Sequence, residues 1–271
     1  MLRPRITPCL LIRNRGLVKT VRFADPKYVG DPVNAVKIFN EKEADELIAL
    51  DIDATAQRRE PDFRLIGQIA VECRMPLCYG GGIKTVDHAK RIIALGVEKI
   101  AISSVVLEND KIVSLIAKEI GSQSVVVVVD VKRNTGNGYE VWTHNGTRNT
   151  RKFLVDVLEL AESAGAGEIL VNSIDNDGAM KGYDLELGRL VRHSTKLPMT
   201  MLGGAGSLAD VQRLIGECGV IGAAAGSLFV FKGIYKAVLI NYPSQVQKEE
   251  IIRSASTDSE NEAARARPLV S

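Results

Sequence analysis

Short apolar runs alternate with longer amphipathic stretches along most of the chain. The apolar runs have the length of buried strands, and in the stretches between them apolar residues recur every three or four positions, as on one face of a helix. Strands are expected at 5–12, 47–52, 76–80, 99–103, 125–131, 168–173, 198–202 and 221–225. Helices are expected at 32–44, 61–73, 85–95, 109–120, 151–164, 184–195 and 207–216. Buried strands that alternate with helices predict parallel β/α units.

The two halves of the chain resemble each other. The run GGGI at 80–83 corresponds to GGAG at 203–206, and ADELIALDID at 44–53 corresponds to AGEILVNSID at 166–175. Two similar halves of four β/α units close into an eightfold barrel, whereas a doubly wound open sheet does not need such a duplication. The sequence therefore predicts an α/β protein with a single (β/α)8 TIM barrel made of two similar half-barrels.

Composition and charge narrow the class of protein further. The predicted barrel spans 1–253, and the polar stretch 254–271 is expected to be a disordered C-terminal tail. The 35 basic and 33 acidic residues leave a formal net charge of +2, so no nucleic acid or membrane partner is expected. No run reaches the ~18 apolar residues of a membrane helix, and the N-terminus lacks the features of a signal peptide. The four cysteines lack metal-ligand spacing, so no metal site is expected. We expect a cytoplasmic enzyme without a cofactor.

Two glycine clusters end strands, one in each half, and each is followed along the chain by a second strand end made of small residues. Glycine lets backbone N–H groups approach a phosphate closely, and a following helix N-terminus favours negative charge. Two related cradles predict a long substrate with a phosphate at each end; tight turns needed only for packing are the alternative. The cradle residues are Gly80, Gly81, Gly82, Ser103 and Ser104 in the first half, and Gly203, Gly204, Gly206, Gly226 and Ser227 in the second.

Acidic residues stand at the carboxyl ends of three predicted strands, where the catalytic groups of a barrel belong. They are Asp51, Asp130 and Asp177. Asp130 closes the run VVVVVD, and a carboxylate beside a buried apolar strand can have a raised pKa that suits general acid/base work. A helix N-cap or a structural ion pair is the alternative for this residue.

Charged residues also begin four of the predicted strands. Arg5, Glu46, Lys99 and Glu168 come from different strands and should ring the bottom of the barrel. Two cations and two anions can neutralise one another there. Residues on this face usually serve stability, and spacing alone favours that interpretation.

Together these residues resemble the cyclase subunit of imidazole glycerol phosphate synthase, from about residue 1 to 240. The matching stretches are RITPCL, Lys19, DELIALDI, GGGI, EKIAIS, VVVVVDVKR, AGEIL, SIDNDG, GGAG and AAAGSLF. The resemblance implies a lyase of histidine biosynthesis that joins ammonia to a two-phosphate ribulose-type intermediate. It also implies a heterodimer, with a glutaminase subunit that docks on the bottom face and feeds ammonia through the barrel.

The resemblance also implies roles for single residues. The ring of Arg5, Glu46, Lys99 and Glu168 matches a charged gate at the ammonia entrance, which reverses the interpretation from spacing. Lys19, in the long loop after the first strand, matches a substrate-binding lysine, and Asp130 matches one of two catalytic aspartates. The glycine clusters with Ser104 and Ser227 match the two phosphate sites, and Asp51 and Asp177 are expected beside the substrate.

The chain departs from the family at the barrel mouth. Leu11 stands where the other catalytic aspartate is expected, Leu202 replaces a small polar residue and Ser103 replaces an amide. Leucine cannot move a proton, and losing a positioned acid or base costs roughly 10² to 10⁴ in rate. In this respect the chain is similar to a divergent second form of the subunit, associated with bacterial surface-polysaccharide enzymes.

Three functions therefore remain open. The first is the cyclase subunit of the histidine pathway, working despite Leu11. The second is a subunit that delivers ammonia to a sugar amidotransferase, which makes acetamidino sugars for surface polysaccharides such as lipopolysaccharide. The third is a non-catalytic scaffold for a glutaminase. The related two-phosphate isomerase of the same pathway is an alternative by fold, but it should lack the charged ring.

Overall fold

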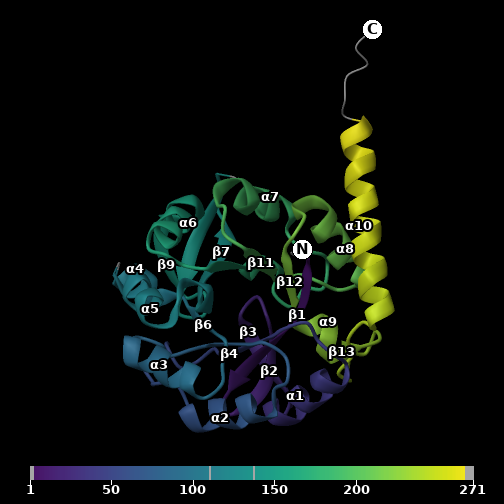
Figure 1. The fold of residues 1–271 in the computed structure, drawn as a ribbon. Helices are drawn as coiled ribbons and strands as arrows, with labels where there is room; N and C mark the ends of the chain where they lie inside the picture. The colour runs from purple at the N-terminus through teal and green to yellow at the C-terminus, as the bar shows by residue number, and fades with distance from the viewer. Residues whose placement is uncertain (1–2, 110, 137, 266–271) are drawn as a thin grey trace.

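Eight parallel strands form a closed barrel in a computed structural model that describes residues 3–109, 111–136 and 138–265. The strands follow one another around the barrel in chain order, and pairing of the last with the first closes it (Figure 1). Each predicted strand is confirmed. The strands are β1 (Arg5–Arg13), β4 (Leu47–Asp51), β5 (Leu77–Gly80), β6 (Lys99–Ile102), β7 (Val125–Arg133), β10 (Glu168–Ser173), β11 (Met199–Leu202) and β12 (Gly222–Ala225).

The predicted helices cover the outside of the barrel, as Figure 1 shows. Several begin where the sequence supplies a cap: the Asp31 side chain accepts a hydrogen bond from the Asn34 amide, and Pro32 takes the first helical position. The helices are α1 (Pro32–Glu41), α2 (Phe63–Glu72), α3 (Val86–Ala94), α5 (Ile112–Ile120), α6 (Leu154–Ser163), α7 (Leu185–Ser194) and α8 (Leu208–Cys218).

Alternation along each strand divides the core into two layers. On β1, Ile6, Leu10 and Ile12 belong to the outer layer between strands and helices, whereas Cys9 belongs to a separate inner cluster. This inner cluster fills the lumen of the barrel, and the partly buried Leu11 and Leu50 pack against it. Its members are Cys9, Ile48, Cys78, Ala101, Val126, Val128, Leu170, Leu202 and Ala224.

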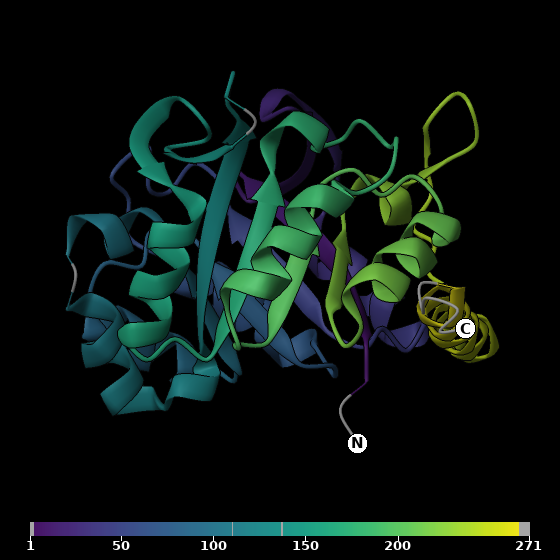
Figure 2. The same ribbon diagram turned by 90° about the horizontal axis from the view of Figure 1, so that it is seen from above.

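Three hairpins that the sequence did not predict lie at the carboxyl end of the barrel strands. Figure 2 shows them along its upper edge, in purple, teal and lime. The expected long loop after the first strand is the first of these hairpins, and it carries Lys19. The hairpins are β2–β3 (Gly16–Val21 and Ala24–Gly30), β8–β9 (Tyr139–Thr143 and Arg148–Phe153) and β13–β14 (Phe231–Lys232 and Ala237–Val238).

The predicted tail 254–271 begins inside a helix and stays a prediction. Helix α10 (Gln245–Arg265) packs on α8, and residues 266–271 lie outside the described residues. The start of the helix is anchored, because Lys248 is 3% exposed and its Nζ donates to Asp45 Oδ1 at 2.7 Å. Further along, Ala255 is 1% exposed and joins the core. Within the described ranges, no helix is long and apolar enough to cross a membrane.

Candidate functional site

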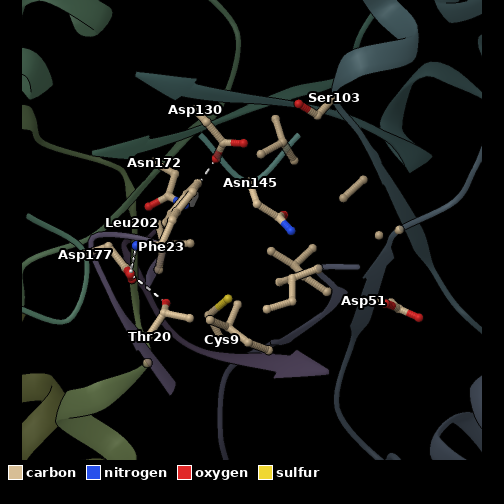
Figure 3. A pocket seen from close by; sticks show the side chains of 18 of the residues that line it. Cys9, Thr20, Phe23, Asp51, Ser103, Asp130, Asn145, Asn172, Asp177 and Leu202 are labelled. Carbon is tan, nitrogen blue, oxygen red and sulfur yellow. Dashed lines mark hydrogen bonds between the residues drawn. The ribbon is translucent and has the colours of Figure 1, made fainter. Parts of the chain in front are cut away.

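A pocket of about 240 Å³ opens where the barrel strands end, between the β2–β3 and β8–β9 hairpins. It brings together the predicted substrate residues of both halves of the chain except Gly206, which does not line it. Figure 3 shows Asp130 and Asp177 on one side of the pocket and Asp51 on the opposite side. The predicted residues that line the pocket are Lys19, Asp51, Gly81, Gly82, Ser104, Asp130, Asp177, Gly203, Gly204, Gly226 and Ser227.

Both glycine clusters have residues with positive φ. Gly81 and Gly82 have φ of 121° and 73°, and Gly203 and Gly204 have φ of 100° and 107°, a region that L-residues rarely adopt. A Cβ on Gly81 would lie 2.5 Å from the Asp51 carbonyl oxygen, and one on Gly204 only 2.1 Å from a neighbouring carbonyl. Glycine is therefore required at both turns, and each turn exposes backbone to the pocket without a side chain in the way.

A small residue on the neighbouring strand completes each turn. Ser104 begins the short helix α4 (Ser104–Glu108) after β6, and Ser227 begins α9 (Ser227–Val230) after β12. Strands β5 and β6 lie across the barrel from β11 and β12, because two strands separate the pairs on each side. The geometry thus offers two related concave sites at opposite sides of one mouth, as a two-phosphate ligand would need.

Lys19 lies beside the second of these sites. Its side chain is 5% exposed, and its Nζ donates to the Cys9 carbonyl oxygen at 2.6 Å. A Cβ on Gly226 would lie 2.5 Å from that Nζ. Burial lowers the pKa of Lys19. The Asp177 carboxylate opposes this shift, and an anion held at Gly226 would add a second negative charge beside the lysine.

Asp130 ends the apolar part of β7 and faces the pocket. Burial raises the pKa of its carboxyl group to about 7, although the Asn172 side chain opposes the shift by donating to Oδ1 at 3.2 Å. The nearby Asp177 carboxylate adds to the upward shift. A carboxyl group with a pKa near neutrality can both take up and release a proton, so the geometry suits Asp130 to acid/base work.

The other two predicted carboxylates are engaged by their surroundings. Asp51 accepts hydrogen bonds from the backbone of Asp53 and Ala54 at 3.1 and 3.0 Å, and from both terminal nitrogens of Arg59 at 3.3 Å. Asp177 accepts from Thr20 Oγ1 at 2.6 Å and from the Phe23 amide at 3.1 Å. Asp51 therefore fixes the loop after β4, and Asp177 holds the β2–β3 hairpin over the mouth (Figure 3).

A leucine lies opposite Asp130 in the wall of the pocket. Strands β1 and β7 are separated by three strands on either side, so Leu11 and Asp130 face one another across the barrel. Leu202, 6% exposed, extends the apolar surface on β11. Ser103, the third departure, also lines the pocket. At the position that faces Asp130, the mouth therefore has an apolar side chain in place of a carboxyl group.

The four charged residues at the strand starts form one closed ring. Arg5 Nη1 lies 3.1 Å from Glu46 Oε2 and Arg5 Nη2 lies 2.6 Å from Glu168 Oε1. Lys99 Nζ lies 2.7 Å from Glu46 Oε1 and 2.8 Å from Glu168 Oε2. Burial alone would raise the pKa of Glu168, but Arg5 and Lys99 outweigh it and the pKa lies below its ordinary value. Arg5, Lys99 and Glu168 therefore stay charged at neutral pH, and the ring closes the bottom of the lumen.

Substitution of Lys99 by Met should destabilise the fold, because it leaves Glu46 and Glu168 with Arg5 alone. Their side chains are 6% and 8% exposed, so the excess charge stays away from water. We expect a loss of about 2–4 kcal/mol in the free energy of unfolding, measured in urea. The matched control is Lys90→Met, which breaks an exposed pair with Glu119 and should cost less than about 1 kcal/mol. Equal losses in the two variants would contradict this account of the ring.

Asn172, which lines the pocket beside Asp130, is not among the site residues predicted from the sequence. The alternation of the strand could have identified it, because Asn172 stands four residues after Glu168 on β10 and so lies on the same inward face. Thr20 and Phe23 are also absent from the prediction, since the hairpin that brings them over the mouth was expected to be a loop. Arg13, another lining residue, pairs with Asp53 at 2.7 Å.

Comparison with known proteins shows the family of the chain. A family described as "Histidine biosynthesis protein" matches residues 5–236. A protein of Leptospira borgpetersenii, provisionally named imidazole glycerol phosphate synthase subunit HisF, is 56% identical over 252 residues, which cover 93% of this chain and 99% of that protein. A provisionally named subunit hisF2 of Pseudomonas aeruginosa is 50% identical over 90% of this chain and 97% of that protein.

More distant relatives belong to the same family. The imidazole glycerol phosphate synthase subunit HisF of Lactococcus lactis subsp. cremoris is 38% identical over 259 residues, which cover 93% of this chain and all of that protein. The chain is thus more similar to the hisF2 protein than to this HisF subunit, as expected for a divergent second form. It belongs to the histidine biosynthesis protein family, as a HisF-type (β/α)8 barrel.

Proposed function

We propose that this chain is a cyclase-type subunit of imidazole glycerol phosphate synthase that binds a two-phosphate ribulose intermediate and combines it with ammonia. A glutaminase subunit, docked at the bottom face as a heterodimer partner, supplies the ammonia. The observation that carries this proposal is the arrangement along the barrel axis. A closed charged ring stands at one end of the lumen, and a pocket with two glycine cradles stands at the other.

The chemistry assigned to the mouth follows from its residues. The cradles and Lys19 hold the two phosphates, and Asp130 moves protons during ring closure and cleavage. No step needs a metal or cofactor in this proposal. A scaffold that merely held a glutaminase would need neither the cradles nor the buried Lys19 and Asp130.

Leu11 favours a second candidate function. Neither Asp51 nor Asp177 is free to replace the missing carboxylate, because each is bound to backbone and side-chain donors elsewhere. A barrel that receives ammonia but cyclises slowly can deliver it to another acceptor. We infer that a sugar amidotransferase of surface-polysaccharide synthesis is this acceptor if cyclisation proves slow.

The ammonia route is tested in the complex of the chain with its glutaminase, using Leu11→Asp as the background in which cyclisation is measured. Turnover driven by glutamine is compared with turnover driven by ammonium chloride. We expect Lys99→Met to lower the ratio of the two rates by about tenfold, because unpaired glutamates would retain ammonium as a counter-ion. Lys90→Met serves as the control. An unchanged ratio in Lys99→Met would count against passage through the ring.

A further inference from the structure

The β13–β14 hairpin carries the two most exposed large apolar side chains among the described residues. Its tip holds Ile234 and Tyr235, which are 87% and 90% exposed, and the chain continues from there into the exposed Val238 and Leu239. Figure 2 shows this hairpin in lime, projecting at the carboxyl end of the barrel. Apolar side chains that gather on one exposed segment are typical of a surface that binds another molecule.

The hairpin is held in place by its own hydrogen bonds. At its base, the Leu239 amide donates to the Val230 carbonyl oxygen at 2.9 Å, and the Asn241 side chain donates to the Leu239 carbonyl oxygen at 3.1 Å. At the turn, the Lys236 amide donates to the Gly233 carbonyl oxygen at 3.1 Å. A surface that is ordered before it binds loses less conformational entropy when a partner docks.

The hairpin stands beside the second phosphate cradle. Its first strand follows α9 directly, and α9 begins at Ser227, which lines the pocket. The hairpin residues 231–239 do not line the pocket themselves. The charged ring lies at the starts of the strands, at the opposite end of the barrel. A molecule docked on the hairpin would therefore stand at the mouth and leave the bottom face free.

The charge around the hairpin is positive. The exposed Lys232 and Lys236 flank its tip, and Lys27 of the β2–β3 hairpin lies over the Phe231 ring, with its Nζ 5.8 Å from the ring centroid. The sequence from 218 to 248 contains no acidic residue. The electrostatic complement of this surface is an acidic one, and the tip residues need an apolar recess.

Two other occupants fit the hairpin less well. In a symmetric dimer of this chain the same patch would face its own copy, so Lys232 and Lys236 would meet like charges. A flat bilayer would meet the tip alone, whereas Val238 and Leu239 lie back towards the barrel, where the chain returns from the tip. An acidic protein surface with a recess can cover the tip and these two residues together.

We propose that the β13–β14 hairpin is the docking surface for the enzyme that accepts the ammonia, and that this enzyme binds through an acidic patch with an apolar recess for Ile234 and Tyr235. The docked enzyme lies over the mouth beside the second cradle. A glutaminase at the bottom face can then be bound at the same time. This inference rests on the second candidate function, because it assumes that the acceptor is another protein.

The apolar part of the surface is tested by biolayer interferometry of the full chain against the purified sugar amidotransferase of the same cell. We expect the double variant Ile234→Ser with Tyr235→Ser to weaken binding by about tenfold or more, because apolar and aromatic anchors carry most of the energy of such interfaces. The matched control is Val71→Ser on α2, which changes a side chain that is 84% exposed and distant in the fold. It should bind as the natural chain does.

The charged part is tested in the same assay. Lys232→Glu with Lys236→Glu should lower the association rate by about tenfold at low salt, and the rate should then depend less on salt than in the natural chain. Lys118→Glu, which changes an exposed lysine on α5, is the control and should leave the rate unchanged.

Several results would overturn the proposal. They are an absence of binding by the natural chain, equal binding by the natural chain and the Ile234→Ser with Tyr235→Ser variant, and competition between the amidotransferase and a glutaminase. Self-association, or binding to phosphatidylglycerol vesicles, that this variant abolishes would assign the hairpin to another occupant. Titration with the two-phosphate ribulose intermediate should be the same in the natural chain and both double variants. The phosphate sites are thereby tested without the amidotransferase, so the docking surface can fail while the cyclase-type function stands.

Discussion

Substitution of Leu11 by Asp should raise the rate of cyclisation by roughly 10² to 10⁴ when ammonium and the two-phosphate ribulose intermediate are both saturating. Leu11 faces Asp130 across the mouth, with three strands between them on each side. An aspartate there would give the pocket a second positioned carboxyl group. The rate is measured without a glutaminase, so that only chemistry at the mouth is compared.

Leu50 provides the matched control for this gain. It is the register partner of Leu11 on β4, packs against the same inner cluster and also lines the pocket. Leu50→Asp adds the same charge at a similar burial but on the neighbouring strand. We expect no comparable gain from Leu50→Asp. A natural chain as fast as Leu11→Asp would show that cyclisation tolerates the leucine, and the delivery of ammonia to a sugar amidotransferase would lose its support.

Substitution of Asp130 by Asn should lower the turnover rate in the Leu11→Asp background by a factor of roughly 10² to 10⁴. Asparagine keeps the size of the side chain but can neither take up nor release the proton. The same change should increase stability at neutral pH, because burial disfavours the charged form of Asp130. If Asp130→Asn has a lower turnover rate and a higher free energy of unfolding, then Asp130 serves the chemistry although it destabilises the fold.

The stability gain should depend on pH in a defined way. The pKa of Asp130 lies at about 7 in the folded chain, above the ordinary value of 3.8. The natural chain therefore loses stability, relative to Asp130→Asn, as pH rises from about 4 to 7. Asp130 also lines the pocket, where solvent can screen its charge. We therefore expect the free energies of unfolding of the two chains to differ by only about 1–2 kcal/mol at pH 8. Urea unfolding at pH 4 and pH 8 measures it, and an equal difference at both would contradict the raised pKa.

The barrel could be predicted from the sequence because its signals are local and repeated. Each buried strand is a short apolar run between turn residues, and the two glycine clusters mark equivalent positions in both halves. The charged ring could also be placed, since Arg5, Glu46, Lys99 and Glu168 each begin or precede a strand. Spacing alone favoured a purely stabilising role, and only the resemblance suggested a gate.

The hairpins and the C-terminal helix could not be predicted for physical reasons. Hairpin β2–β3 contains exposed positions and a register shift, so it lacks a clean alternation of apolar and polar residues. Helix α10 has a polar sequence, and its start is fixed by contacts distant in the chain, such as that of Lys248 with Asp45. The contact of Asn172 with Asp130 also depends on tertiary structure, because the two residues lie on different strands.

Isothermal titration of the natural chain with the two-phosphate ribulose intermediate tests the central claim most directly, because it does not require cyclisation. The account predicts that one molecule binds per chain. It also predicts that Ser104→Asp and Ser227→Asp each weaken binding by about tenfold or more, which is about 1.4 kcal/mol, because each places a carboxylate in one cradle. Folding of both variants is checked by urea unfolding. No binding by the natural chain, or binding that neither variant weakens, would contradict the assignment of the mouth as a two-phosphate site.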